Sequence, residues 1–216
     1  ESGCAVSYVG CLGRPALHPV FAEMARRCKA CYSLAEPGTT DALEFRDGKL
    51  MLGKHETLKE VTWGRMLEVA GKDRIRQAWE TSNLIALTNW TMLPHQTDIW
   101  RQLHREFSGV KPVKGAILFV DLADPEKRPP AESAEAVRFL RSFRTTHRVV
   151  LGVNQKESLE VGGALGLKFQ ADAIEANAVA LRKALELDAV VVHPTRNAAC
   201  ATESGSAVLD GRLADE

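Results

Sequence analysis

The sequence has little that would connect it to membranes or nucleic acids. No apolar run approaches the roughly 18 residues of a membrane-spanning helix, so no membrane partner is predicted. Neither a signal peptide nor a low-complexity segment is visible. The 28 basic and 28 acidic residues balance, and no long basic stripe occurs. This balance argues against nucleic acid or an anionic membrane surface as the main partner.

Cysteine is scarce and odd in number, which argues against a disulfide framework. The five cysteines lie mostly in apolar contexts: Cys4, Cys11, Cys28, Cys31 and Cys200. Cys28 and Cys31 form a C-x-x-C, but no second Cys or His pair follows at zinc spacing. We therefore expect reduced structural thiols and a cytoplasmic location.

A dinucleotide fingerprint is also missing. Residues 5–13 predict a strand that ends in a Gly-rich turn, but Gly10 and Gly13 do not complete G-x-G-x-x-G. The absence of this motif with an acidic partner counts against an unrelated nucleotide-binding enzyme such as a dehydrogenase.

The pattern that is present is an alternation of apolar strands and helices from Leu84 onward. The 216 residues suffice for one sizeable core, so we expect a single domain over 1–216. Strands without polar alternation are typical of a parallel sheet buried on both faces. The predicted strands are 84–89, 115–121, 149–153 and 189–193, and the predicted helices include 97–107, 133–144 and 171–185. This order predicts a three-layer α/β/α, Rossmann-like fold with a mostly parallel sheet.

Residues 42–53 are predicted to form an element separate from the main sheet. Alternating residues flank Asp47-Gly48, which predicts an antiparallel β-hairpin. Its apolar side chains Leu43, Phe45, Leu50 and Leu52 must be buried somewhere if the hairpin is an appendage to the main sheet.

Asn154 and Glu157 follow the buried strand 149–153 at a spacing of three residues. Both side chains therefore project to the same side of the helix mouth, which in open α/β sheets is where ligands bind. A carboxylate and an amide there suit a hydrated Mg²⁺ that accompanies substrate phosphates. The alternative is a capping box, with Asn154 as N-cap and Glu157 as its third helical residue.

The order of these parts resembles the ribokinase-like (PfkB) carbohydrate kinases. The resemblance is carried by residues 9–13, by the early hairpin, by the loop from Asp121 to Arg128 and by Asn154-x-x-Glu157. It implies a ribokinase-like fold with the hairpin 42–53 as a β lid over a sugar. It also implies ATP and Mg²⁺ as cofactors, a sugar or sugar-like hydroxyl as acceptor, and a homodimer through the lid.

The same resemblance implies roles for nine residues. Asn154 and Glu157 would organise the metal and phosphates; Asp41, Asn89 and Asp121 would bind the sugar; Lys127, Arg128, His193 and Arg196 would border the nucleotide. Each residue also has a structural alternative. Asp41 can cap its own turn; Asn89, Asp121 and His193 can be polar strand ends; and Lys127, Arg128 and Arg196 can be solvated loop residues. We expect the four tryptophans to lie in the core.

Two parts of the family pattern do not occur in the sequence. These are the amino-terminal Gly-Gly sugar-binding turn and the carboxy-terminal Gly-Ala-Gly-Asp signature that supplies the catalytic base. We therefore expect the chain to be incomplete at both ends, with no catalytic base and no measurable kinase activity of its own. The loop at 193–197 lacks the family's glycines, which leaves nucleotide preference open. The alternative function is a non-catalytic sugar- or nucleotide-binding regulatory relative.

Overall fold

The structure, a computed structural model, describes residues 3–211, which fall into two compact units. The first unit extends through Ala78 and includes Met92–Gln102. The second comprises Trp79–Thr91 and the chain from Leu103 onward. Each unit is described by itself below, and the single domain over 1–216 stays a prediction.

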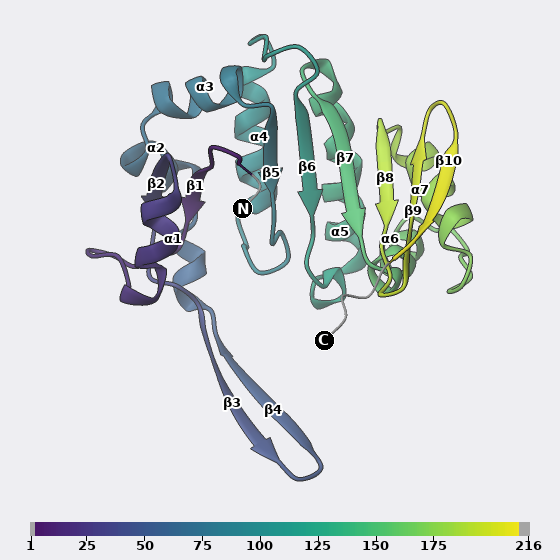
Figure 1. The fold of residues 1–216 in the computed structure, drawn as a ribbon, viewed down its shortest axis with the longest axis horizontal. Helices are drawn as coiled ribbons and strands as arrows, with labels where there is room; N and C mark the ends of the chain where they lie inside the picture. The colour runs from purple at the N-terminus through teal and green to yellow at the C-terminus, as the bar shows by residue number, and fades with distance from the viewer. Residues whose placement is uncertain (1–2, 212–216) are drawn as a thin grey trace. The chain divides into compact units, whose positions relative to one another are not determined.

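The second unit contains a six-stranded sheet (Figure 1). Its strand order is β10-β9-β8-β7-β6-β5. The strands from β5 to β8 are parallel, whereas β9 and β10 pair antiparallel, so the predicted mostly parallel sheet is confirmed. Their bounds are β5 Leu84–Leu87, β6 Ile117–Asp121, β7 Arg148–Val153, β8 Ala189–Val192, β9 Asn197–Thr202 and β10 Ser206–Asp210.

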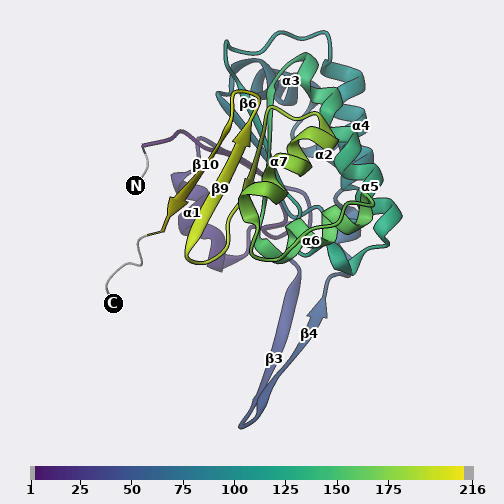
Figure 2. The same ribbon diagram turned by 90° about the vertical axis from the view of Figure 1, so that its right-hand side faces the viewer.

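Helices connect the parallel strands and flank the sheet. Helix α5 packs against α6, α6 packs against α7, and α7 lies against β8 and β9, beside β10 (Figure 2). The bounds are η3 Pro125–Lys127, α5 Pro130–Phe139, η4 Leu140–Thr145, α6 Gln155–Ala164 and α7 Ile174–Leu185, where η denotes a 3₁₀ helix. The helix predicted over 133–144 therefore starts earlier and tightens to 3₁₀ geometry from Leu140.

Burial within the sheet differs from the uniform burial predicted for the strands. Leu118 and Val120 are fully buried, while Ile117 and Phe119 between them are only partly buried. Because successive side chains of a strand point to opposite faces, one face is tightly packed and the other is half-buried. The predicted buried strand at 84–89 is an edge strand instead, and Leu84 is 57% exposed.

The first unit contains two small sheets. Strands β1 (Ser7–Gly10) and β2 (Ala30–Ser33) pair in parallel, and β3 (Thr39–Phe45) and β4 (Gly48–Lys54) form the predicted antiparallel hairpin. Figure 1 shows this hairpin as a long ribbon extending away from β1 and β2. The remaining elements, two of which continue into the second unit, are η1 Pro19–Phe21, α1 Ala22–Arg27, η2 Glu56–Glu60, α2 Trp63–Val69, α3 Lys72–Thr81 and α4 Gln96–Phe107.

Aromatic side chains fill much of the core, as expected for the tryptophans. Trp79, Trp90 and Trp100 are buried, whereas Trp63 is only partly buried. Trp79 contacts Phe107, Phe143 and His147 within the second unit, at ring-centroid distances of 5.9, 5.9 and 4.5 Å. Across residues 3–211 no helix combines the length and apolarity that a membrane crossing requires.

Candidate functional site

The N-terminus of α6 follows directly from β7 and is closed by a capping box. The Asn154 side chain accepts a hydrogen bond from the Glu157 backbone N–H at 2.9 Å, and Glu157 Oε2 accepts one from the Asn154 N–H at 2.9 Å. Asn154 has extended backbone geometry, as an N-cap residue requires. The structural alternative predicted for this pair is therefore formed. Capping does not exclude metal binding, because the two contacts use different lone pairs. The pair's role in metal binding stays a prediction.

Glu157 also holds the loop that follows β6. Its Oε1 accepts a hydrogen bond from the Asp124 N–H at 3.0 Å, and the residue is only 5% exposed. Ala123 and Asp124 both have positive φ, of 61° and 59°, a conformation that non-glycine residues adopt at a cost. Glu157 therefore stabilises a strained loop beside the helix mouth.

Asp121 lies close enough to both Glu157 and His193 for their charges to act on it. Asp121 ends β6 beside Gly152 of β7, and the His193 N–H, after β8, donates to the Val153 carbonyl at 2.9 Å. The pKa of Asp121 is raised, first by burial and then by the negative charge of Glu157, while His193 acts in the opposite direction. The structure thus brings three of the predicted residues together at the carboxyl ends of neighbouring parallel strands.

The side chains at this edge fit a hydrated divalent cation. Each Glu157 oxygen accepts one backbone N–H and keeps a second lone pair, and the nearby Asp121 adds negative charge. Mg²⁺ commonly uses one or two carboxylates together with water and substrate phosphates. Among residues 3–211, no group of three or more His, Cys, Asp or Glu side chains is arranged to hold a metal by itself.

The substrate candidates Asn89 and Asp41 lie in different units. Asn89 follows β5 in the second unit, is exposed, and has a φ of 62°. Asp41 belongs to the first unit, where it lies within β3 rather than in a turn. Its carboxylate pairs with Lys54 at 2.6 Å, and both side chains are exposed. The turn-capping alternative for Asp41 is therefore wrong, because the hairpin begins at Thr39.

The four cations predicted near the nucleotide have different surroundings. Lys127 is exposed and pairs with Asp124 at 3.0 Å. His193 and Arg196 are also exposed, and Arg196 lies just before β9. Arg128 is not a solvated loop cation, since its side chain is 11% exposed and donates to the backbone carbonyls of Trp90 and Thr91.

Sequence reasoning did not single out Asp124, Trp90 or Thr91, which contact the predicted residues. Asp124 immediately precedes Pro125, and an Asp-Pro pair signals a turn but gives no indication of a distant partner. Trp90 and Thr91 follow Asn89 directly, and no local pattern indicates a partner for their carbonyls. In the structure these carbonyls accept hydrogen bonds from Arg128, which is distant in the sequence.

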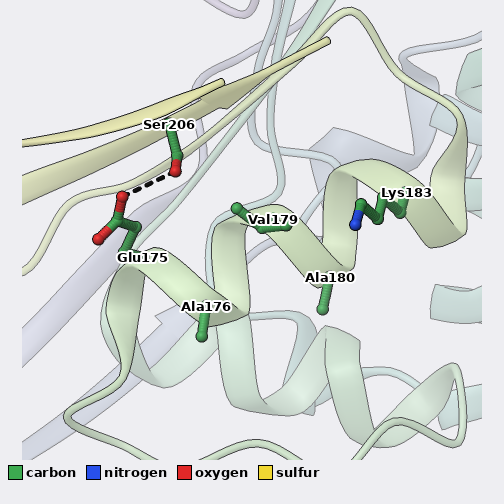
Figure 3. Close-up of a pocket in the computed structure, with 6 residues that line it drawn as sticks. All are labelled: Glu175, Ala176, Val179, Ala180, Lys183 and Ser206. Carbon is green, nitrogen blue, oxygen red and sulfur yellow. Dashed lines mark hydrogen bonds between the residues drawn. The ribbon is translucent and has the colours of Figure 1, made fainter. Parts of the chain in front are cut away.

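A surface hollow of about 410 Å³ lies elsewhere in the second unit, between α7 and β10 (Figure 3). Within it, Ser206 donates a hydrogen bond to Glu175 Oε1 at 2.7 Å. The hollow is lined by Glu175, Ala176, Val179, Ala180, Lys183 and Ser206. None of the predicted site residues lines this hollow, so it is not the candidate site.

The fold is that of the ribokinase-like kinases. The structure of adenosine kinase from Trypanosoma brucei brucei superimposes with a TM-score of 0.64 at 16% sequence identity, covering 97% of this chain and 62% of that one. The sequence matches the prokaryotic ketohexokinase family over residues 1–215, and the chain belongs to this family. A ketohexokinase of Haloferax volcanii is 30% identical over 160 residues, which cover 74% of this chain and 42% of that protein. The chain therefore spans less than two thirds of the length of either relative.

Proposed function

We propose that the protein is an ATP-dependent carbohydrate kinase that transfers the γ-phosphoryl group of ATP to a hydroxyl group of a ketohexose. The observation that carries the proposal is the convergence of Asp121, Glu157 and His193 beside the capped N-terminus of α6. Membership of the prokaryotic ketohexokinase family, together with the similar Haloferax protein, supports the substrate class.

The first turn of α6 suits the phosphates of ATP. Backbone N–H groups and the positive end of the helix dipole favour an anion at a helix N-terminus. Asp121 and Glu157 would repel a phosphate unless a cation lies between, which supports Mg²⁺ bound with the nucleotide. When bound, the ion would offset negative charge on the transferring phosphoryl group. In this proposal Asn154 and Glu157 would hold the ion, and Lys127, His193 and Arg196 would border the nucleotide.

The polar residues that the family resemblance points to are proposed as partners for the sugar. We assign Asn89 and Asp121 at the strand ends and Asp41 on the hairpin as hydrogen-bonding partners for sugar hydroxyls. The proposed role of the hairpin is that of a lid, as in the family it resembles, and all residues of β3 and β4 are exposed. No residue of 3–211 is assigned as the base that accepts the proton of the attacking hydroxyl.

The lid also supports a homodimer. By strand alternation, Asp41, Leu43 and Phe45 share one face of the hairpin with Leu50 and Leu52. The four apolar side chains are between 45% and 58% exposed: Leu43 45%, Phe45 58%, Leu50 50% and Leu52 46%. Covering this face with a second copy of the lid would remove it from water.

We place the protein in the cytoplasm. The five cysteines are thiols outside any disulfide within residues 3–211, and Cys4 is exposed. Burial raises the pKa of Cys11 to about 11, so this thiol stays protonated and unreactive at neutral pH. Such a set of thiols is typical of a reducing compartment.

The proposed activity is tested by coupled ADP release from the protein expressed from its complete open reading frame. The assay supplies ATP and Mg²⁺ with ketohexoses, aldohexoses and nucleosides in parallel. We expect ketohexose-dependent ADP release well above the rate without sugar. Calorimetric binding of a sugar with no ADP release would favour the non-catalytic regulatory relative instead. Release that depends on a nucleoside alone would contradict the assigned substrate class.

A further inference from the structure

Arg128 lies at the end of the loop between β6 and α5, immediately after η3. Its backbone N–H donates to the Pro125 carbonyl at 3.1 Å, and its own backbone is extended. From this position the side chain points inward rather than to solvent, as its 11% exposure indicates. The carboxylate of Glu132 lies 3.8 Å from Nη1, at the outer limit of an ion pair.

The guanidinium group of Arg128 fastens the segment that follows β5. Nε donates to the Thr91 carbonyl at 3.0 Å, and Nη2 donates to the Trp90 carbonyl at 2.8 Å. The same group lies 4.1 Å from the centre of the Trp90 ring, and Trp90 is fully buried. A planar guanidinium can stack on the ring and reach two adjacent carbonyls at once, which a lysine ammonium cannot.

The backbone continues this connection. The Thr91 N–H donates to the Leu122 carbonyl at 2.9 Å, and this bond joins the segments after β5 and β6 together with the two bonds from Arg128. At the other end of the same loop, the Asp124 N–H donates to Glu157. The loop from Leu122 to Arg128 therefore links the segment after β5 to the mouth of α6.

Asn89 directly precedes the two fastened residues. Its φ of 62° is a left-handed conformation, which costs non-glycine residues free energy although asparagine tolerates it better than most. The carbonyls of Trp90 and Thr91 accept hydrogen bonds from Arg128. The Thr91 N–H donates to the Leu122 carbonyl. Loss of the guanidinium would leave two carbonyls without their charged donor and release the constraint on Asn89.

We propose that Arg128 is a positioning residue that holds Asn89 for the sugar through the Trp90 and Thr91 carbonyls, and not a nucleotide ligand. The inference rests on the proposed function, because it assigns a role within the same sugar site. It replaces the nucleotide role that the family resemblance implied for Arg128. Its effect should therefore fall on the sugar and not on ATP.

Steady-state kinetics separate the two roles of Arg128. For Arg128→Lys we expect the KM for the sugar to rise on the order of tenfold, and for Arg128→Met on the order of a hundredfold, the scale that small misplacements of a binding group produce. The KM for ATP should change less than about twofold, since no contact with ATP is removed. A rise in the KM for ATP with an unchanged KM for the sugar would overturn the proposal, as would unchanged values of both.

Arg144 provides a matched control within the second unit. It also donates to a backbone carbonyl, that of Glu186 at 2.9 Å, and pairs with Asp188 at 3.1 Å, near the opposite ends of the strands. Arg144→Lys and Arg144→Met should lower thermal stability while both KM values stay near those of the wild type. An equal rise in the KM for the sugar in the Arg144 variants would mean that general loosening explains the Arg128 effect, and would overturn the proposal.

Hydrogen exchange tests the positioning without any activity. In the protein without substrates, Arg128→Lys should speed amide exchange at Asn89–Thr91 at least tenfold more than at the amides of β7. Arg144→Lys should leave amide exchange at Asn89–Thr91 unchanged. Unchanged exchange at Asn89–Thr91 would contradict the proposal even if the protein is a kinase. If the wild type turns over no sugar, the proposed function fails, and the exchange result still decides whether Arg128 holds this segment.

Discussion

The carboxylate of Glu157 accepts a hydrogen bond from the backbone N–H of Asp124, 33 residues earlier in the chain, at 3.0 Å. Its other oxygen accepts the N–H of Asn154, so a single buried side chain fixes both the start of α6 and the loop after β6. The charge of Glu157 also raises the pKa of Asp121, which ends β6, so the residue that caps α6 is also the one proposed to hold the ion. This double role allows stability and activity to be separated by mutation.

Glu157→Gln keeps a side chain of the same shape but removes the charge and one acceptor. We expect the free energy of unfolding to fall by about 1–2 kcal/mol, the cost of a lost cap and a poorly satisfied buried group. Turnover should fall at least about tenfold with a higher Mg²⁺ requirement, because a charged partner of the proposed ion is lost. Chemical denaturation and a Mg²⁺ titration of ADP release measure the two effects.

Thr62→Ala is the control for capping alone. Thr62 caps α2, where its hydroxyl accepts the Arg65 N–H at 3.2 Å. This variant should lose about 1 kcal/mol of stability with an unchanged Mg²⁺ titration. If Glu157→Gln behaves in the same way, Glu157 acts only as a cap.

Leu50→Lys should dissociate the proposed dimer, since it places a charge in the centre of the apolar face of the lid. Light scattering at micromolar concentration should give a dimer mass for the wild type and a monomer mass for the variant. Met51→Lys is the matched control, because Met51 is 60% exposed but lies on the opposite face of β4. A monomeric wild type would contradict the interface.

Asp41→Asn should raise the KM for the sugar about tenfold, because it removes a charged hydrogen-bond acceptor from the lid. Stability should change little, since exposed ion pairs such as Asp41–Lys54 contribute little to it. Lys54→Met breaks the same pair without removing the carboxylate, and its KM should stay close to that of the wild type. Equal effects of the two substitutions would show that only the ion pair matters.

Acid should destabilise the second unit through His147. This side chain is 3% exposed and its ring lies 4.5 Å from that of Trp79, and burial lowers its pKa below the usual 6.5. The unfolded chain therefore takes up the proton first, so the free energy of unfolding falls as pH drops below 6.5. Denaturation at about pH 5.5 and about pH 7.5 should show a smaller difference for His147→Gln than for the wild type. Equal differences would exclude His147 as the cause.

Local patterns predicted most of the elements. Apolar runs marked the strands, Asp47-Gly48 marked the hairpin, and Asn154 with Glu157 marked the start of α6, because each signal lies within a few residues. The edge position of β5 was not predicted, since apolar composition alone does not tell an edge strand from a central one.

The contacts that shape the candidate site lie beyond local patterns. Arg128 reaches carbonyls 37 and 38 residues away, and these partners depend on the register between β5 and β6. The hydrogen bond from the Asp124 N–H to Glu157 likewise depends on the register between β6 and β7. A sequence shows a cation in a loop, but only the folded sheet shows whether that cation faces solvent or backbone.

The most direct test of the proposed kinase is the mass of the product. The protein from its complete open reading frame is incubated with D-fructose, ATP and Mg²⁺, and the sugar is examined by mass spectrometry alongside the ADP released. The account predicts one sugar monophosphate for each ADP, with Glu157→Gln forming both at least about tenfold more slowly. Unmodified sugar together with unconsumed ATP, from a folded protein that binds the sugar, would contradict it.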